Sequence, residues 1–399
     1  MKILVVHEVS YLKKVVYEFQ ILPEALSLLG HEVTVVDFDD TPLDSPDKPL
    51  FSLATRRDDN VHRAYPDASI TLRHPGTVRI RVLSRVLGAL TATLEIGRVL
   101  REASFDAVLL YAVPTVGIQS VLTARRYDVP VFFRSIDVSH QLVPFRVLSP
   151  PTRLIERYVY NNAAGVSALT PRLKDYVASL GVPQARIGVL PAGVDVQMFS
   201  GGQRKPSLLG KWGIDPHDPV VLFMGTIYRF SGLDTVIRGF PRLLAEHPNA
   251  RLLVVGHGED QARLSELAVA AGVSRNVIFT GRQPYQLLPD IIRASDICIN
   301  PFELNAITRD ILPTKLFQYL ACERPLVATR LPGTEPFLSG EDHGVVYSSL
   351  EGFVDELSTL LGQPERRALL GKNARRAMQS RYDWKRIAEG LINWMKEVR

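Results

Sequence analysis

The 399 residues of the chain exceed the usual size of one hydrophobic core, so the length predicts two domains of about 150 to 200 residues each. With 46% hydrophobic and 22% charged residues, the composition excludes a disordered or fibrous protein. The net charge of +5 comes without a zinc-finger pattern, an RNA-binding signature or a basic tail, which argues against a nucleic-acid partner.

The number of cysteines and the length of the apolar runs indicate the cellular compartment of the protein. Cys298 and Cys322 are too few for a disulfide framework and lie in apolar stretches, so we expect them in a core and in a reducing environment. The apolar start, residues 1–6, is far shorter than a signal peptide requires, and the apolar region 107–122 is broken by a proline and a glycine. The sequence therefore predicts a cytoplasmic protein.

The first half of the chain alternates strand-like apolar runs with segments of helical length, which is typical of a parallel sheet. A strand at 2–7, a helix at 16–29 that ends at Gly30 and a second strand at 32–37 form a Rossmann-type opening. No G-x-G-x-x-G follows the first strand, which argues against a dinucleotide-dependent dehydrogenase. Further strands are expected at 107–111, 129–133 and 165–167.

A basic segment interrupts this pattern at residues 60–101, which hold seven arginines against Asp67 and Glu95. Arginines interleaved with apolar residues indicate an interfacial helix, and the segment predicts contact with lipid phosphate at the inner face of a membrane. A solvated amphipathic surface helix is the alternative. The six arginines that are interleaved with apolar residues are Arg73, Arg79, Arg81, Arg85, Arg98 and Arg101.

A domain boundary is indicated near residue 200, where a strand at 187–190 leads into a polar, glycine-containing stretch. We therefore expect one domain at 1–200, a second at 201–382 and a final helix at 383–399 whose apolar face packs on the first domain. A second strand series predicts another Rossmann-like domain. Its strands are expected at 220–224, 252–255, 277–280, 297–300 and 326–328.

Ligands collect at the carboxyl ends of parallel strands, so the residues after the strands of the second domain are candidate site residues. Gly225 would let the backbone approach a phosphate and Arg229 could pair with it, although a glycine there is also ordinary turn chemistry. Gly256 and Gly258 form a tight turn into the next helix. Arg282 could stack on a nucleobase or lie on the surface.

The stretch after the strand at 297–300 carries the richest signal. Pro313 suits the start of a helix, and the free N–H groups of that helix, with Lys315 in its first turn, form a diphosphate site. A cation at a helix N-terminus opposes the dipole and favours a bound anion. The alternative is a solvated surface lysine.

These residues resemble family four of the GT-B glycosyltransferases, which are retaining enzymes that use nucleotide sugars, and the resemblance covers nearly the whole chain. The resemblance implies two Rossmann-like doubly wound parallel-sheet domains of an α/β fold facing across a cleft, with the acceptor in the first and the donor in the second. It is carried by 168–173, 190–195, Met198, Phe199, Gly225, 256–258, Gly281, Ser295, Asp296, Pro301, 319–321, Pro325 and Trp384.

The resemblance also assigns roles to individual positions. The two glutamates of the family fall on Asp310 and Gln318, which could hydrogen-bond the donor sugar and ribose. The Arg and Lys that neutralise the leaving diphosphate fall on Thr226 and Ser231, so we expect Arg229 and Lys315 to replace them. The expected donor contacts are Gly225, Thr226, Ser231, Gly256, Gly258, Arg282, Pro313, Thr314, Leu316 and Gln318.

Acceptor residues are placed by the resemblance in the loop after the first strand and around 134–140, where Asp137 and His140 are candidates. The expected catalytic set is Asp310, Lys315, Arg229, Asp137 and His140. The reaction implied is retaining transfer from a nucleoside-diphosphate sugar to a hydroxyl of a polysaccharide, a lipid-linked glycan or a small molecule. It needs no cofactor and no metal.

Three other readings compete with a transferase. A catalytically impaired nucleotide-sugar-binding or scaffold protein is motivated by Thr226, Ser231 and Gln318. An epimerase of the same fold would need further acid and base groups, and no clear set is present. A two-lobed solute-binding protein would carry an export signal, which the sequence does not show.

Overall fold

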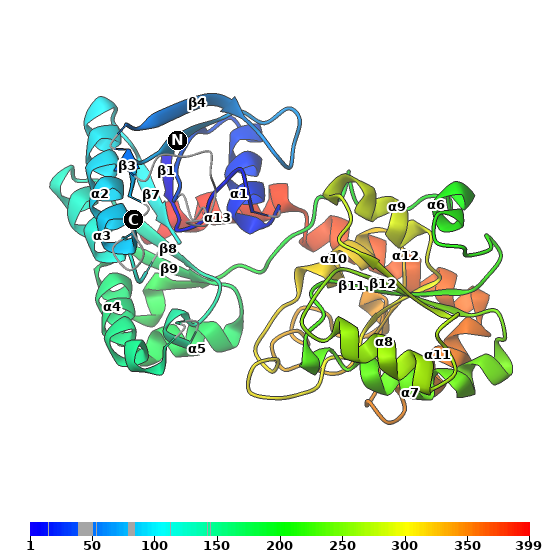
Figure 1. The fold of residues 1–399 in the computed structure, drawn as a ribbon. Helices are drawn as coiled ribbons and strands as arrows, with labels where there is room; N and C mark the ends of the chain where they lie inside the picture. The colour runs from blue at the N-terminus through cyan, green and yellow to red at the C-terminus, as the bar shows by residue number, and fades with distance from the viewer. Residues whose placement is uncertain are drawn as a thin grey trace. The chain divides into compact units, whose positions relative to one another are not determined.

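The computed structural model describes the chain except residues 15, 39–50, 53, 79–83, 112, 142 and 144. The chain forms two compact units, each built around its own sheet (Figure 1). Unit 1 comprises Met1–Pro191 and Trp384–Arg399, and unit 2 comprises Ala192–Asp383. The C-terminal helix α13 (Trp384–Val398) thus belongs to unit 1.

The sheet of unit 1 has the strand order β10-β9-β8-β7-β1-β2-β5-β4, and only β4 runs antiparallel to its neighbour. The chain starts at β1 in the middle, winds outward through β2, and returns to β7 on the other side of β1, as in a Rossmann-like sheet. Its strands are β1 (Lys2–Val6), β2 (Glu32–Val36), β4 (Arg56–Val61), β5 (Ile70–His74), β7 (Ala107–Leu110), β8 (Val131–Ser135), β9 (Gly165–Ala168) and β10 (Ile187–Val189), and β3 (Phe51–Ser52) pairs separately with β6 (Thr77–Val78).

Helices cover both faces of this sheet. On one face α1 (Glu18–Leu28) contacts α13, and on the other α2 (Ser84–Glu102), α3 (Gly117–Arg126) and α4 (Ser149–Asn162) lie side by side. Helix α5 (Pro171–Ser179) packs on β9 and β10. The ring of Trp394 fills the space that side chains at Gly165 and Gly188 would need, since a Cβ there would lie within 2.8 Å of it.

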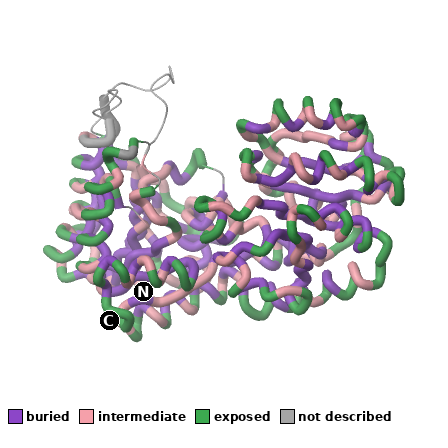
Figure 2. The backbone as a smooth tube through the Cα atoms, turned by 90° about the horizontal axis from the view of Figure 1, so that it is seen from below, coloured by how far each residue is buried: buried purple, intermediate pink, exposed green. Residues whose placement is uncertain are grey.

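The sheet of unit 2 is entirely parallel, with the order β13-β12-β11-β14-β15-β16. Buried strands form its centre (Figure 2). Its strands are β11 (Val220–Met224), β12 (Arg251–Val255), β13 (Val277–Gly281), β14 (Ile297–Asn300), β15 (Leu326–Ala328) and β16 (Val345–Tyr347). One face carries α7 (Leu233–Glu246), α8 (Gln261–Ala270) and α11 (Phe353–Leu361), and the other α9 (Leu288–Arg293), α10 (Thr314–Ala321) and α12 (Pro364–Arg381), while the short α6 (Pro206–Gly210) precedes β11.

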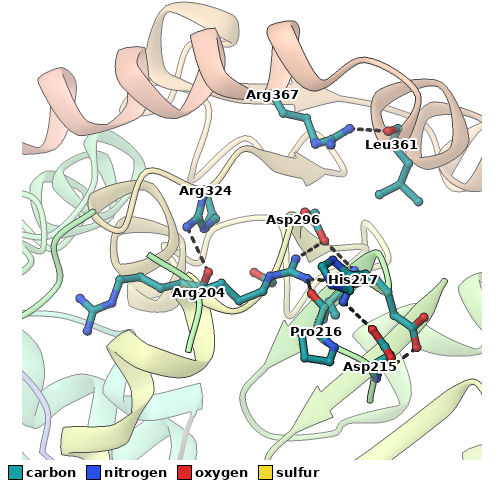
Figure 3. A network of polar contacts seen from close by, with 12 residues as sticks. Arg204, Asp215, Pro216, His217, Asp296, Arg324, Leu361 and Arg367 are labelled. Carbon is teal, nitrogen blue, oxygen red and sulfur yellow. Dashed lines mark hydrogen bonds and ion pairs between the residues drawn. The ribbon is translucent and has the colours of Figure 1, made fainter. Parts of the chain in front are cut away.

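A polar network fixes the amino ends of the two central strands of unit 2 (Figure 3). Asp296, just before β14, accepts a hydrogen bond of 2.8 Å from the backbone N–H of Val220 at the start of β11. Arg204 forms an ion pair with the same carboxylate and donates to the carbonyls of Pro216 and Asp218. The network therefore holds β11 and β14 together at the edge opposite their carboxyl ends.

The expected fold class is confirmed, because both units are doubly wound α/β structures. The strands expected at 220–224, 297–300 and 326–328 coincide with β11, β14 and β15, and the two cysteines are free and buried. The sequence did not predict β4, β5 or β16. Among the described residues, no helix is long and apolar enough to cross a membrane.

The interpretation of 60–101 as one arginine-rich interfacial helix is wrong for Arg73. This residue lies in strand β5, is buried, and forms ion pairs with Glu95 and Glu102 of α2, while Arg98 pairs with Glu95 as well. Arg79 and Arg81 lie outside the described residues, as does the side chain of Arg85. Arg101 is exposed near the end of α2.

Candidate functional site

The two central strands of unit 2 mark the point where the winding of the chain reverses direction. From β11 the chain continues through β12 and β13 on one side, and from β14 through β15 and β16 on the other. Open α/β sheets bind ligands outside the carboxyl ends of the strands at this point. The candidate site therefore lies at Gly225, which follows β11, and at Pro301, which follows β14.

Glycines allow the loops after β11, β12 and β13 to stack closely. Gly225 and Gly256 both have φ near +138°, a conformation that disfavours other residues. Gly225 donates to the carbonyl of Val255 at 2.9 Å and Gly256 to that of Gly281 at 3.0 Å. A Cβ on Gly256 would lie 1.9 Å from the oxygen of Gly225, and one on Gly258 would lie 2.1 Å from that of Ile227. The loops that carry these predicted glycines therefore pack directly against one another through their backbones.

Helix α10 is tied to the end of β11 by one buried hydroxyl. Tyr319 Oη accepts a hydrogen bond from the N–H of Met224 at 2.7 Å and donates one to its carbonyl at 3.2 Å. Lys315 lies one helical turn before Tyr319, so both side chains point to the same strand end. Pro313 occupies the N-cap position, and the helix begins at Thr314. The sequence order Pro313, Thr314, Lys315 thereby places a helix N-terminus beside Gly225.

The ammonium group of Lys315 is buried in this corner without a hydrogen-bond partner among the described residues. Its Nζ lies 3.9 Å from the ring centroid of Phe223 and 4.4 Å from that of Phe302. A Cβ on Gly225 would be 3.6 Å from Nζ. Burial lowers the pKa of Lys315 well below its ordinary value of 10.5. An anion here would supply the hydrogen-bond acceptors and the countercharge that the protein does not.

Two further buried polar side chains next to this corner also lack partners among the described residues. Asn300 lies at the end of β14, and neither its Nδ2 nor its Oδ1 has a hydrogen-bond partner in the described part of the chain. Ser231 lies in the loop after β11, and its Oγ also lacks one there. The loops after β11 and β14 contact each other, since the backbone N–H of Glu303 donates to the carbonyl of Phe230 at 3.0 Å. Ser231 was a predicted donor contact, whereas Asn300 was not predicted.

The other predicted donor residues surround the corner with differing exposure. Thr226, Arg229 and Arg282 are exposed, and Gln318 is half-buried on α10. Leu316 is fully buried in the core and faces away from solvent, so its side chain is unavailable to a ligand. Of the two proposed replacement cations, Lys315 has its ammonium buried in the corner and Arg229 is exposed.

The loop that carries Asp310 is held by the loop after β15. Gly333 donates to the carbonyl of Arg309 at 2.8 Å, and Thr334 Oγ1 donates to that of Ile311 at 3.0 Å. A Cβ on Gly333 would lie 2.5 Å from the backbone of Asp310, so a larger residue would displace this loop. The Asp310 side chain is exposed, 4.0 Å from the guanidinium of Arg309.

In unit 1, His140 is held by two residues that sequence reasoning missed. Its Nδ1 lies 2.7 Å from Glu156 Oε2 and 3.0 Å from the hydroxyl of Tyr176, which itself donates to Glu156 at 2.7 Å. Glu156 is completely buried on α4 and also accepts from the N–H of Ser139. A carboxylate on Nδ1 orients the ring so that Nε2 is left for another partner.

Asp137 follows β8, close to a buried ion pair. Arg134 donates to Glu18 at 2.6 Å and to the carbonyl of Leu190 at 2.7 Å, and Tyr111 at the end of β7 also donates to Glu18. Asp137 is an exposed residue, but the protein that surrounds its carboxyl, and to a lesser degree repulsion from Glu18, raise its pKa to about 6. Its carboxyl group is therefore able to exchange a proton near neutral pH.

His7, at the end of β1, is a further buried residue that the sequence did not single out. Neither ring nitrogen has a partner among the described residues, and the ring stacks on Tyr11 with centroids 6.0 Å apart. Burial lowers the pKa of His7 to about 4, so the ring is neutral at neutral pH. Only its position at a strand end could have indicated a site.

Two family models match the chain, each over one part of it. The Glycosyl transferase 4-like domain matches residues 20–193, and Glycosyl transferases group 1 matches residues 205–377. Together the two matches cover the sheet of unit 2 and all strands of the unit 1 sheet except β1.

Named relatives are similar over part of their length. The chain is 30% identical over 213 residues to a D-inositol 3-phosphate glycosyltransferase of Segniliparus rotundus, covering 52% of this chain and 46% of that protein. It is 30% identical over 209 residues to a GDP-mannose-dependent monoacylated alpha-(1-6)-phosphatidylinositol monomannoside mannosyltransferase of Corynebacterium glutamicum, covering 51% and 54%. The chain thus spans about half the length of these two relatives.

Solved structures share the fold over the full chain. Sucrose-phosphate synthase from Thermosynechococcus elongatus superimposes with a TM-score of 0.73 at 16% identity, covering 100% of this chain and 98% of that one. HepE of Anabaena in complex with UDP gives a TM-score of 0.71 at 15% identity, covering 99% and 100%.

Proposed function

Because the chain belongs to the GT-B glycosyltransferases that join a glycosyl transferase 4-like domain to a group 1 domain, we propose that it transfers a sugar from a nucleoside diphosphate to an acceptor hydroxyl. Unit 2 binds the donor at the carboxyl ends of β11 and β14. The names of the relatives and of the solved complexes include GDP-mannose and UDP, which supports a nucleoside-diphosphate donor.

The observation that carries this proposal is the buried ammonium of Lys315 at the start of α10, which has no hydrogen-bond partner in the part of the chain that the structure describes. The helix dipole and burial both oppose a positive charge at this place, and burial lowers the pKa of Lys315. A diphosphate reverses that balance, because it accepts hydrogen bonds from Nζ and from the first N–H groups of α10. Gly225, which lacks a side chain, lets the backbone of the β11 loop approach the same anion.

The same groups stabilise the departing diphosphate. Negative charge grows on the phosphate oxygen as its bond to the anomeric carbon breaks, so a preorganised cation there acts more strongly in the transition state than in the ground state. Thr226 and Ser231 carry no charge at the positions of the two family cations. Lys315 takes over that role, with Arg229 available from the solvent-exposed rim.

We propose a retaining, metal-independent course for the reaction. The acceptor oxygen bonds to the anomeric carbon on the face from which the diphosphate leaves, and the acceptor proton passes to the departing phosphate oxygen. The nucleoside diphosphate leaves with the electron pair of the broken bond. No protein nucleophile takes part, and Asp310 and Gln318 hold sugar and ribose hydroxyls.

Unit 1 supplies the acceptor site in this proposal. His140, oriented through Nδ1 by Glu156, and Asp137, with its raised pKa, bind and orient the acceptor hydroxyl. The names of the two relatives refer to an inositol phosphate and to a phosphatidylinositol mannoside, which supports a hydroxyl of a phosphorylated or lipid-carried acceptor. Polysaccharide and other small-molecule acceptors are tested alongside.

The proposal is tested with UDP-, GDP-, ADP- and TDP-sugars, measuring thermal stabilisation and slow hydrolysis to free nucleoside diphosphate. We expect one nucleotide class to stabilise the protein and to be hydrolysed, and Lys315→Met to lose both effects. Lys372→Met, an exposed lysine of unit 2, is the matched control and should behave as wild type. No response to any donor would contradict the proposal.

The same assay separates a transferase from a binding protein. A donor that stabilises the chain, but is neither hydrolysed nor transferred to any acceptor offered, identifies a nucleotide-sugar-binding protein. That outcome would follow if Thr226, Ser231 and Gln318 remove too much of the catalytic machinery.

A further inference from the structure

The outer side of α4 and the residues just before it expose large apolar side chains. Phe145, Val147 and Leu154 are 66%, 77% and 67% exposed, and Leu148 and Tyr158 are exposed as well. A single exposed leucine is ordinary on a soluble protein, but five such residues within one short segment form a patch. These five residues are called the α4 patch below.

The charges beside the α4 patch are positive. Arg153 and Arg157 are exposed on the same side of α4 as Leu154 and Tyr158, because these four residues follow the spacing of adjacent helical turns. The one acidic residue of α4, Glu156, is completely buried and bonded to His140 on the inner side. Residues 138–155 contain no Asp or Glu. The exposed side of α4 is therefore apolar and basic.

The neighbouring helix extends this surface. Helix α3 packs beside α4 and exposes Leu122, Arg125 and Arg126, and it contains no acidic residue. Because α3 and α4 cover the same face of the sheet, their outward residues face the same solvent (Figure 1). Two adjacent helices thus present leucine and arginine together.

We propose that the α4 patch docks on the anionic surface of a lipid bilayer. Phe145, Val147 and Leu154 enter the boundary between headgroups and acyl chains, and Tyr158 lies at headgroup level. Arg153 and Arg157 contact the phosphates of a negatively charged membrane. The charge complementarity favours lipid over a protein partner or a second copy of the chain, since a basic apolar face repels its own copy.

This surface differs from the segment 60–101 that the sequence indicated. In that segment, Arg73 is buried and forms an ion pair with Glu95, and Arg98 forms an ion pair with the same glutamate. The proposal does not rest on the transfer reaction, because docking requires no sugar donor. It does bring the inner side of α4, which holds His140, close to the lipid surface.

The test is sedimentation of the full chain with vesicles of phosphatidylcholine alone or mixed with phosphatidylglycerol. We expect binding to the anionic vesicles, weakened by high salt, and little binding to the neutral ones. The apolar variant V147S/L154S and the charge variant R153E/R157E should each need at least about tenfold more lipid for half-maximal binding, consistent with two lost or reversed contacts.

Matched controls use equally exposed residues of unit 2. V269S/L369S replaces two exposed apolar residues on α8 and α12, and R376E reverses an exposed charge on α12. Both controls should bind vesicles as wild type does. Circular dichroism and donor-induced thermal stabilisation, measured on every variant, separate loss of docking from misfolding and from failure of the donor site.

Three outcomes would overturn the proposal. The first is absence of wild-type binding to anionic vesicles, and the second is equal binding by wild type and both α4 variants. The third is a concentration-dependent dimer in sedimentation velocity that V147S/L154S abolishes, which would assign the patch to a second copy of the chain.

Discussion

The hydroxyl of Tyr319 hydrogen-bonds both backbone groups of Met224: it accepts from the N–H at 2.7 Å and donates to the carbonyl at 3.2 Å. These bonds fix the rotation of α10 relative to β11 and so determine where Lys315 points. The side chain that orients the cation is thus one helical turn away from it.

Removal of this hydroxyl should loosen the donor site. In Tyr319→Phe the backbone groups of Met224 lose their partner inside the protein, which we expect to lower the free energy of unfolding by about 1 to 3 kcal/mol. Donor affinity should fall because Lys315 is less well placed. Urea unfolding and donor titration check both effects. Tyr347→Phe, which removes a hydroxyl bonded to Leu338, is the control and should leave donor affinity unchanged.

Donor binding should take up a proton at Lys315. Burial holds the pKa of Lys315 well below its ordinary value, and a bound diphosphate raises it, so donor affinity should fall as pH rises above the lowered pKa. Calorimetry in two buffers of different ionisation enthalpy measures the proton uptake. Lys315→Met should abolish it, and an unchanged proton count in that variant would contradict this assignment.

Neutralising the carboxylate behind His140 should affect sugar transfer to the acceptor and leave donor hydrolysis unchanged. Glu156→Gln keeps the volume of the buried side chain but offers Ser139, His140 and Tyr176 only one acceptor oxygen. We expect transfer to fall about 10- to 100-fold, as when the carboxylate partner of a functional histidine is removed. Donor hydrolysis and thermal stability with donor should change little. Equal losses in transfer and hydrolysis would indicate a structural role.

The buried His7 should make the protein less stable in mild acid. Its pKa is about 4 in the folded protein and near 6.5 when unfolded, so the unfolded chain binds more protons between these values. Stability is unaffected above pH 6.5 and falls by about 2 kcal/mol on reaching pH 5. His7→Phe should lose that part of the pH dependence. Urea titrations at pH 5 and pH 7.5 compare the two proteins.

Local sequence patterns predicted the strands and the glycine turns of the candidate site in unit 2. Pro313 and Lys315 were also found from sequence, because helix capping and charge depend on residues close together in the chain. Long-range partners were not found. Glu156 is sixteen residues from His140, and nothing in its surroundings distinguishes it from a surface helix glutamate.

The basic segment shows where local patterns fail. Arg73 alternates with apolar residues in a way that suits both a strand and one face of a helix, and its partner Glu95 belongs to another element. The amphipathic pattern of α10 turns the side chain of Leu316, a predicted donor contact, into the core. In both cases tertiary packing decided which side the residue faces.

The chain leaves unit 1 after Pro191 and returns to it at Trp384, and the two crossings run side by side, with Val194 donating to the carbonyl of Tyr382 at 2.7 Å. Unit 2 is therefore an insertion within unit 1. On a ribosome, all of unit 2 is synthesised before the Trp394 ring reaches the glycines of β9 and β10 that it covers. Unit 1, although it begins first, is the last to be completed.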